Sequence, residues 1–246
     1  FGGTLRLTGF GCSATRVEAP QALELALRWQ AVAPPGRNVT AFAHLLDAAD
    51  HRWAQDDVLV RNEKGQETGR WATGTGGLTR HLLHLLPGIP PGRYTLVVGL
   101  YDPEGNRLPI AGDADMAWEL TEVEVVSPRL ALDPSTLQPT ITLQLPAWPG
   151  LVLWGASVPE GTFHPGEELT VSLDWTAERD LQQDLNVQFA LRGQTQWDEP
   201  LAAYPTSRWS AGELIHALYD LRLPADLPSG GHLLTVCVSP RGTAGG

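Results

Sequence analysis

Lysine is almost absent from this chain of 246 residues, which has 16 arginines and a single lysine, Lys64, against 28 acidic residues. The formal net charge is therefore −11. An acidic chain is poorly suited to bind nucleic acid or an anionic membrane surface, because phosphate contacts need a surplus of positive charge. The composition predicts that nucleic acid is not a partner.

Long apolar runs and cysteines are also scarce. No apolar run reaches about 18 residues, the length of a transmembrane helix, and no basic segment followed by an apolar one indicates a signal peptide. Cys12 and Cys237 are too few for a disulfide framework, so a single bridge and two buried thiols remain alternatives. We expect no cofactor, because the chain contains no phosphate loop, dinucleotide fingerprint or Gly-x-Ser-x-Gly motif.

What the sequence does contain is an internal repeat. LELALRW at Leu23–Trp29 matches LTVSLDW at Leu169–Trp175, and the preceding strand-like segments match at the same offset. Further along, Thr40–Asp47 matches Val187–Gly193 in an alignment that pairs Phe42 with Phe189. A Thr-x-Arg-Trp-x-x-Gly motif then occurs twice, at Thr68, Arg70, Trp71 and Gly74 and at Thr206, Arg208, Trp209 and Gly212. The ordered matches predict a duplication.

Each copy has the pattern of short β-strands. In Leu23–Trp29 the apolar residues alternate with Glu24 and Arg28, as in an antiparallel strand with one buried face. The chain has 26 glycines and 20 prolines, which is typical of many turns between strands. The sequence predicts an all-β fold of two tandem antiparallel sandwiches of the immunoglobulin-like or fibronectin-like type.

The repeat also predicts domain boundaries. We expect a first β-sandwich over residues 1–127, a proline-rich linker over 128–150 and a second sandwich over 151–246. The linker contains one possible extra strand, TITLQL at Thr140–Leu145. The second copy lacks a counterpart of Thr121–Val126, so its last strand either comes from elsewhere, such as TITLQL, or is missing.

Several stretches resemble one family of proteins. These are AFAHLLDAADHRWAQDD, RWATG and LLPGIPPGRYTLVVGLYDPEGNRLPI in the first copy, and HPGEELTVSLDW, YPTSRWSAGE and LRLPADLPSG in the second. They resemble the extracytoplasmic β-sandwich modules appended to bacterial membrane glycosyltransferase-like proteins, which are similar to dolichyl-phosphate-mannose protein mannosyltransferases. The resemblance implies an accessory, non-catalytic module located outside the cytoplasm at the cell envelope.

Tryptophans are the candidate ligand-binding residues. Trp29 and Trp175 lie on the apolar faces of their strands and are predicted core residues. Trp71 and Trp209 follow turns beside Arg70 and Arg208, and either stack on a sugar ring or fold over the end of a sandwich. Four tryptophans have no partner in the other copy and are candidates for an exposed binding surface: Trp53, Trp148, Trp154 and Trp197.

Carboxylates and histidines give weaker signals. Asp56, Asp57, Asp113 and Asp115 could supply the carboxylate pair of a glycosidase, but nothing in the sequence brings them together. Asp113 and Asp115 with Asp102 and Glu104 do not have the spacing of a calcium loop. His81 and His84 would point to opposite faces of a strand, and His44 is expected at the edge of the core. We therefore predict no catalytic residue and no metal site.

Three functional hypotheses follow. The first is a non-catalytic extracytoplasmic interaction or spacer module, whose partner is a glycan or another envelope protein. The second is a structural subunit of a surface assembly, completed by a strand from a neighbouring chain. The third is a glycoside-processing enzyme.

Overall fold

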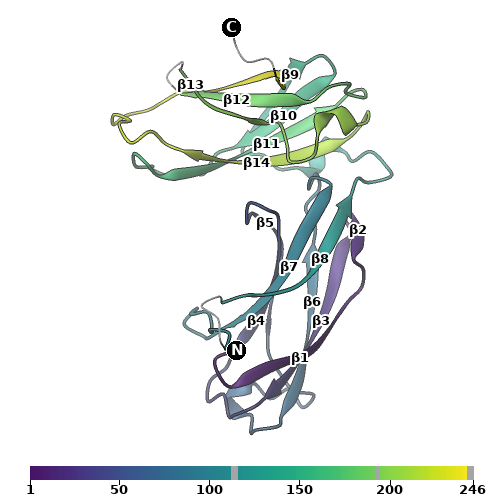
Figure 1. The fold of residues 1–246 in the computed structure, drawn as a ribbon, viewed down its shortest axis with the longest axis vertical. Helices are drawn as coiled ribbons and strands as arrows, with labels where there is room; N and C mark the ends of the chain where they lie inside the picture. Colours follow the sequence, from purple (N-terminus) through teal and green to yellow (C-terminus); the bar gives the residue numbers. More distant parts are fainter. Residues whose placement is uncertain (112–115, 192–193, 243–246) are drawn as a thin grey trace. The chain divides into compact units, whose positions relative to one another are not determined.

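The computed structural model describes residues 1–111, 116–191 and 194–242 (Figure 1). Within these ranges the chain forms fifteen strands, three short 3-10 helices and no α-helix, so the predicted all-β class is confirmed. The strands form four sheets. No helix in the described ranges is both long and apolar enough to span a membrane.

The chain divides into two compact units. Unit 1 comprises Phe1–Leu86 and Arg93–Val126, and unit 2 comprises Pro87–Gly92 and Ser127–Gly246. Each unit contains two of the four sheets and has its own buried core.

Unit 1 has one sheet of three strands and one of five. The smaller sheet has the order β1 (Leu5–Cys12), β3 (Ala22–Ala31), β6 (Gly76–His84). The larger sheet has the order β2 (Arg16–Glu18), β8 (Trp118–Val126), β7 (Gly92–Tyr101), β4 (Thr40–Leu46), β5 (Arg52–Leu59). Trp29 is 1 % exposed, because the apolar face of β3 is turned into the core as the alternation predicts.

Unit 2 has one sheet of four strands and one of three. The larger sheet has the order β14 (Leu214–Arg222), β11 (Glu168–Ala177), β10 (Leu151–Ser157), β9 (Ile141–Trp148). The smaller sheet has the order β13 (Gln194–Pro200), β12 (Leu185–Leu191), β15 (Leu234–Pro240). Trp175 and Phe189 are fully buried in the core of unit 2.

The strand β9 overlaps the extra strand expected at Thr140–Leu145. It pairs antiparallel with β10, in the four-stranded sheet. TITLQL therefore does not supply a last strand beside β15, which pairs with β12 in the other sheet.

Phe42 and Phe189, which the sequence alignment pairs, lie on different faces of their sheets. In β12, Phe189 points into the core and lies opposite Val236. In β4, Ala43 lies opposite the buried Val98, so Phe42 and His44 point to the other face of their sheet. A shift of one residue reverses every side chain of a strand.

Candidate functional site

The two Thr-x-Arg-Trp segments form the same local structure. Each begins with a 3-10 turn, η1 (Thr68–Arg70) in unit 1 and η3 (Thr206–Arg208) in unit 2. The Thr206 hydroxyl accepts a hydrogen bond from the Leu185 backbone N–H at 2.8 Å and donates one to the Gln183 carbonyl at 2.9 Å. The buried Thr68 hydroxyl makes the same two bonds with the loop that precedes β4, at 2.9 Å each. Each threonine therefore fixes the loop that leads into a central strand.

The tryptophans of these segments are buried. Trp71 is 3 % exposed and Trp209 is 1 % exposed. Their indole N–H groups donate to backbone carbonyls five residues earlier, to Gln66 at 2.9 Å and to Tyr204 at 3.1 Å. Neither ring offers a face to a ligand, so the structure does not support a ligand-stacking role for them. The neighbouring Arg70 and Arg208 are exposed.

Trp53 and Trp197 also serve the cores of their units. Trp53 is 4 % exposed, and its indole N–H donates to the Asp47 carboxylate at 2.8 Å. Burial alone would raise the pKa of Asp47, but hydrogen bonds from Trp53 and His51 and from backbone N–H groups outweigh it and lower that pKa. Trp197 lies opposite Phe189 and packs half-buried against the core of unit 2. A ligand site at either residue is not supported by this packing.

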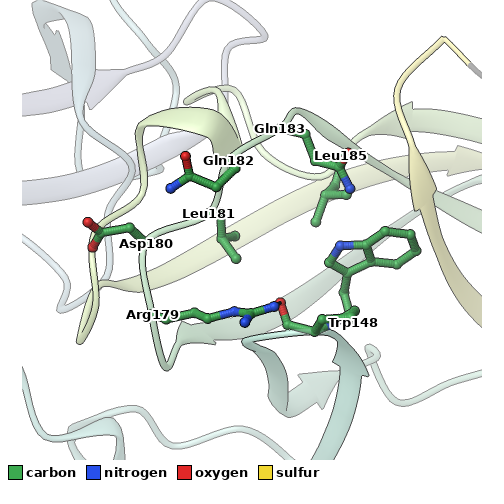
Figure 2. Close-up of a pocket in the computed structure, with 8 residues that line it drawn as sticks. Trp148, Arg179, Asp180, Leu181, Gln182, Gln183 and Leu185 are labelled. Carbon is green, nitrogen blue, oxygen red and sulfur yellow. Dashed lines mark hydrogen bonds between the residues drawn. The ribbon is translucent and has the colours of Figure 1, made fainter.

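The half-buried Trp148 lines a cavity of about 390 Å³ in unit 2 (Figure 2). The remaining walls come from the turn after β9 and from the loop between β11 and β12. In Figure 2 the indole stands at one end, Arg179 runs along one side, and Gln182 and Gln183 lie on the opposite side above Leu181. The lining residues are Trp148, Pro149, Arg179, Asp180, Leu181, Gln182, Gln183 and Leu185.

Hydrogen bonds hold the two sides of the cavity together. Gly150 follows the Trp148–Pro149 turn with a φ of 84°, and its carbonyl accepts from the Glu178 backbone N–H at 2.9 Å. The Arg179 guanidinium donates to the Pro149 carbonyl at 3.1 Å. A side chain at Gly150 would collide with Arg179, which explains glycine at this position.

The far side of the cavity loop is anchored to the segment around Trp209. The Asp180 carboxylate accepts from the Ala211 backbone N–H at 2.9 Å, and the Leu181 N–H donates to the Trp209 carbonyl at 3.1 Å. Leu181 is 5 % exposed and forms the apolar floor. The Thr206–Gly212 segment, in which Arg208 and Trp209 were candidates for ligand contact, thus supports the loop that lines the cavity.

The cavity combines an aromatic ring with hydrogen-bonding groups of both kinds. The Gln182 and Gln183 side chains are exposed and each carries an amide with donors and an acceptor, and Arg179 adds a guanidinium. Asp180 is the single carboxylate among the lining residues. The sequence indicated Trp148 only as one of four tryptophans without a counterpart in the other copy. No sequence motif predicted that Arg179–Leu185 would line a cavity.

The carboxylate candidates within the described residues each have a structural partner. Asp56 accepts from the Leu82 backbone N–H at 2.9 Å, and Asp57 accepts from the Tyr101 hydroxyl at 3.3 Å. Asp102 accepts from the backbone N–H groups of Glu104 and Asn106, which closes the turn after β7. Asp113 and Asp115 lie outside the described residues.

The histidines have structural surroundings. His81 Nδ1 donates to the Asp56 carbonyl at 3.2 Å, and Nε2 accepts from the Thr79 hydroxyl at 3.0 Å, as a neutral ring would. Burial lowers the pKa of His81, in keeping with that neutral form. His84 is exposed on the other face of the strand, as predicted. Within the ranges that the structure describes, no group of three or more potential ligands could hold a metal ion.

The two cysteines are not bonded to each other. Cys12 is partly buried in unit 1, and Cys237 is exposed on β15 in unit 2. The possible Cys12–Cys237 bridge is therefore wrong for this structure, and so is the expectation that both thiols are buried.

Comparison with known proteins gives no family. No protein-family model matches the chain, and no curated protein matches it. Among solved structures, it resembles the Pseudomonas fluorescens alkylpurine DNA glycosylase AlkC bound to DNA containing an abasic site analog, with a TM-score of 0.33 and 13 % sequence identity. That match covers 50 % of this chain and 30 % of the glycosylase chain. A likeness of this size carries no functional argument.

Proposed function

We propose that this chain is a non-catalytic, extracytoplasmic interaction module that contacts glycan through the cavity beside Trp148. The observation that carries the proposal is the half-buried indole facing amide and guanidinium groups in a cavity of about 390 Å³. Ligand pockets commonly measure about 300–1,000 Å³. The apolar face of a sugar ring can stack on an indole, while its hydroxyls both donate and accept hydrogen bonds.

The cavity favours binding over hydrolysis. Glycosidases need two carboxyl groups about 5–9.5 Å apart, on either side of the bond to be cleaved. Asp180 is the single lining carboxylate, and one of its oxygens already accepts from a backbone N–H. Sugar hydroxyls are therefore expected to be bound and released unchanged.

The architecture proposed for the module is a pair of tandem immunoglobulin-like sandwiches that arose by duplication. Three features support it besides the sequence matches. Both Thr-x-Arg-Trp segments make the same threonine and indole hydrogen bonds. The β1–β3 and β10–β11 pairs each contain a bulge, between Leu7 and Gly9 and between Leu153 and Gly155. The glycine that ends each motif donates to a carbonyl at the end of β3 or β11, at 2.8 Å and 2.7 Å.

The location outside the cytoplasm rests on the resemblance to modules of membrane glycosyltransferase-like proteins. Such a module would hold a glycan or an envelope protein near an enzyme. Labelling of Cys237 on intact cells by a thiol reagent that does not cross membranes tests this location. Labelling only after lysis would contradict it.

Glycan binding is tested with the purified chain and an array of envelope and plant-type glycans. Trp148→Ala removes the ring from the cavity, and we expect at least a tenfold loss of affinity for any glycan that binds. Trp118→Ala is the matched control, because Trp118 is 52 % exposed and belongs to unit 1. Equal losses in both variants, or no binding at millimolar glycan, would refute the proposed site.

A further inference from the structure

The five-stranded sheet of unit 1 has aromatic rings buried on the face that points away from the core. Phe42 and His44 on β4 point to this face and are only 2 % and 7 % exposed. Their ring centroids lie 4.7 Å apart, and Tyr101 on β7 stacks with Phe42 at 6.5 Å. No side chain can stand at Gly99 on β7, because a Cβ there would collide with the Phe42 ring. The histidine is therefore held in a packed aromatic group.

Two arginines flank this histidine. A turn after β7 pairs Tyr101 with Arg107, and the Arg107 guanidinium lies over the Phe42 ring, 4.7 Å from its centroid. Arg52 is the first residue of β5, the strand that pairs with β4. Burial, and then the nearby charges of Arg52 and Arg107, lower the pKa of His44 to about 4. Both guanidinium groups therefore lie close to the imidazole, and we call Arg52, Arg107 and His44 the arginine–histidine cluster.

The nitrogen groups of the arginine–histidine cluster lack polar partners. Within the described residues neither arginine forms an ion pair, although four other arginines of unit 1 each pair with a carboxylate, namely Arg16, Arg37, Arg61 and Arg93. His44 is more than nine-tenths buried, yet neither of its ring nitrogens has a hydrogen-bond partner in that part of the chain. Both nitrogens still reach solvent, since Asn186 Oδ1 is the one fully inaccessible side-chain atom there without a partner. Buried polar groups normally have partners, so the unpaired imidazole points to a ligand.

The charge around His44 is positive on balance. On β5, the residue opposite His44 is the neutral Gln55, and the nearby acid is Asp57. The Asp57 carboxylate raises the pKa of His44 and accepts a hydrogen bond from the Tyr101 hydroxyl of β7 at 3.3 Å. Two guanidinium groups against one carboxylate leave an excess of positive charge, in a chain whose net charge is −11. The local charge therefore favours an anion.

We propose that the arginine–histidine cluster binds a phosphate group. Guanidinium groups donate strong hydrogen bonds to phosphate oxygens, and a protonated imidazole adds another donor. A phosphate ester carries a charge of about −1.5 to −2 at neutral pH. Two arginines and a protonated histidine beside Asp57 balance that charge better than they balance the single charge of a carboxylate. His44 is neutral in the free protein, so it takes up a proton from solvent when the phosphate binds.

Proton uptake by His44 is measured by NMR titration of the imidazole signals in the full chain. The variant His44→Gln identifies its signals among those of the seven histidines. Millimolar inorganic phosphate should increase the proton affinity of His44 at least tenfold over sodium chloride of the same ionic strength. Sodium acetate should have a smaller effect, because it carries a single charge. Glucose 6-phosphate should act like inorganic phosphate and glucose should not, since the contacts recognise the phosphate group.

Single substitutions test the location by calorimetric titration with inorganic phosphate. Arg52→Gln and Arg107→Gln each remove one guanidinium group and should weaken phosphate binding at least fivefold. Arg28→Gln is the matched control, because Arg28 is exposed on β3 in the other sheet of unit 1 and the same charge is lost. This control and Trp148→Ala should keep the affinity of the wild type. Arg52 has no contact with the Phe42 ring, so Arg52→Gln provides the test even if Arg107→Gln does not fold.

Three results would overturn the proposal. The first is an equal effect of phosphate and of sodium chloride on the titration of His44. The second is an acetate effect as large as that of phosphate, since the site would then be one for carboxylates. The third is an equal loss of phosphate affinity in Arg28→Gln and Arg52→Gln. Because Trp148 belongs to unit 2 and the arginine–histidine cluster to unit 1, failure of either proposal leaves the other standing.

Discussion

Replacing Thr206 by valine should destabilise unit 2 without changing the size of the side chain. The hydroxyl accepts from Leu185 N–H at 2.8 Å and donates to the Gln183 carbonyl at 2.9 Å, and Thr206 is 2 % exposed. A buried polar group left without a partner costs about 1–3 kcal/mol. Because both an N–H and a carbonyl lose their partner, we expect Thr206→Val to lower the free energy of unfolding by about 2–4 kcal/mol.

Urea denaturation followed by tryptophan fluorescence measures this loss. Thr206→Ser keeps the hydroxyl and removes one methyl group, so it should cost only about 1 kcal/mol. Thr68→Val should destabilise unit 1 by a similar amount to Thr206→Val, because Thr68 makes the same two bonds. Glycan affinity should fall in Thr206→Val, because Thr206 holds the cavity loop in the wild type. It should not change in Thr68→Val. If Thr206→Val costs no more than Thr206→Ser, the hydroxyl does not hold the loop and the reasoning is refuted.

Three further predictions follow from single residues. Burial and two nearby arginines lower the pKa of His44 to about 4, so the folded state resists its protonation. The free energy of unfolding should therefore fall by roughly 2 kcal/mol, allowing for solvent screening, as the pH drops from about 6.5 to 4. His44→Gln should flatten that slope in a urea series across this range, and an unchanged slope would contradict the assignment. Asp47→Asn should weaken the bonds to Trp53 and His51 and lower the thermal midpoint of unit 1 by several degrees, with its largest effect above pH 4, where the carboxylate of the wild type is ionised. Gly150→Ala should force a positive φ on alanine and displace Arg179, so calorimetry should show a loss of at least 1 kcal/mol and glycan titration a weaker affinity. If Gly150→Ala keeps both the stability and the glycan affinity of the wild type, the turn does not shape the cavity.

The candidate site was only partly predictable from sequence. Recurrence of Thr68–Gly74 and Thr206–Gly212 correctly drew attention to a special local structure, but it could not tell whether Trp71 and Trp209 face a ligand or the core. Their burial depends on how the 3-10 turns fold back onto the sheets, which is a tertiary contact. The cavity residues Arg179–Leu185 carry no motif, and only the packing of a loop beside the end of β9 brings them to Trp148.

The sequence by itself determined the all-β class and which faces of the strands are buried, because alternation with a period of two is a local property of an extended chain. It failed where a single residue of register mattered, as with Phe42 and Phe189. Register is decided by the hydrogen bonds that fix each loop and by the neighbouring strand, not by the identity of one aromatic residue. Tertiary structure alone decided that β9 joins β10 rather than β15. Strand pairing joins residues far apart in the chain, and local patterns carry little information about which strands become neighbours.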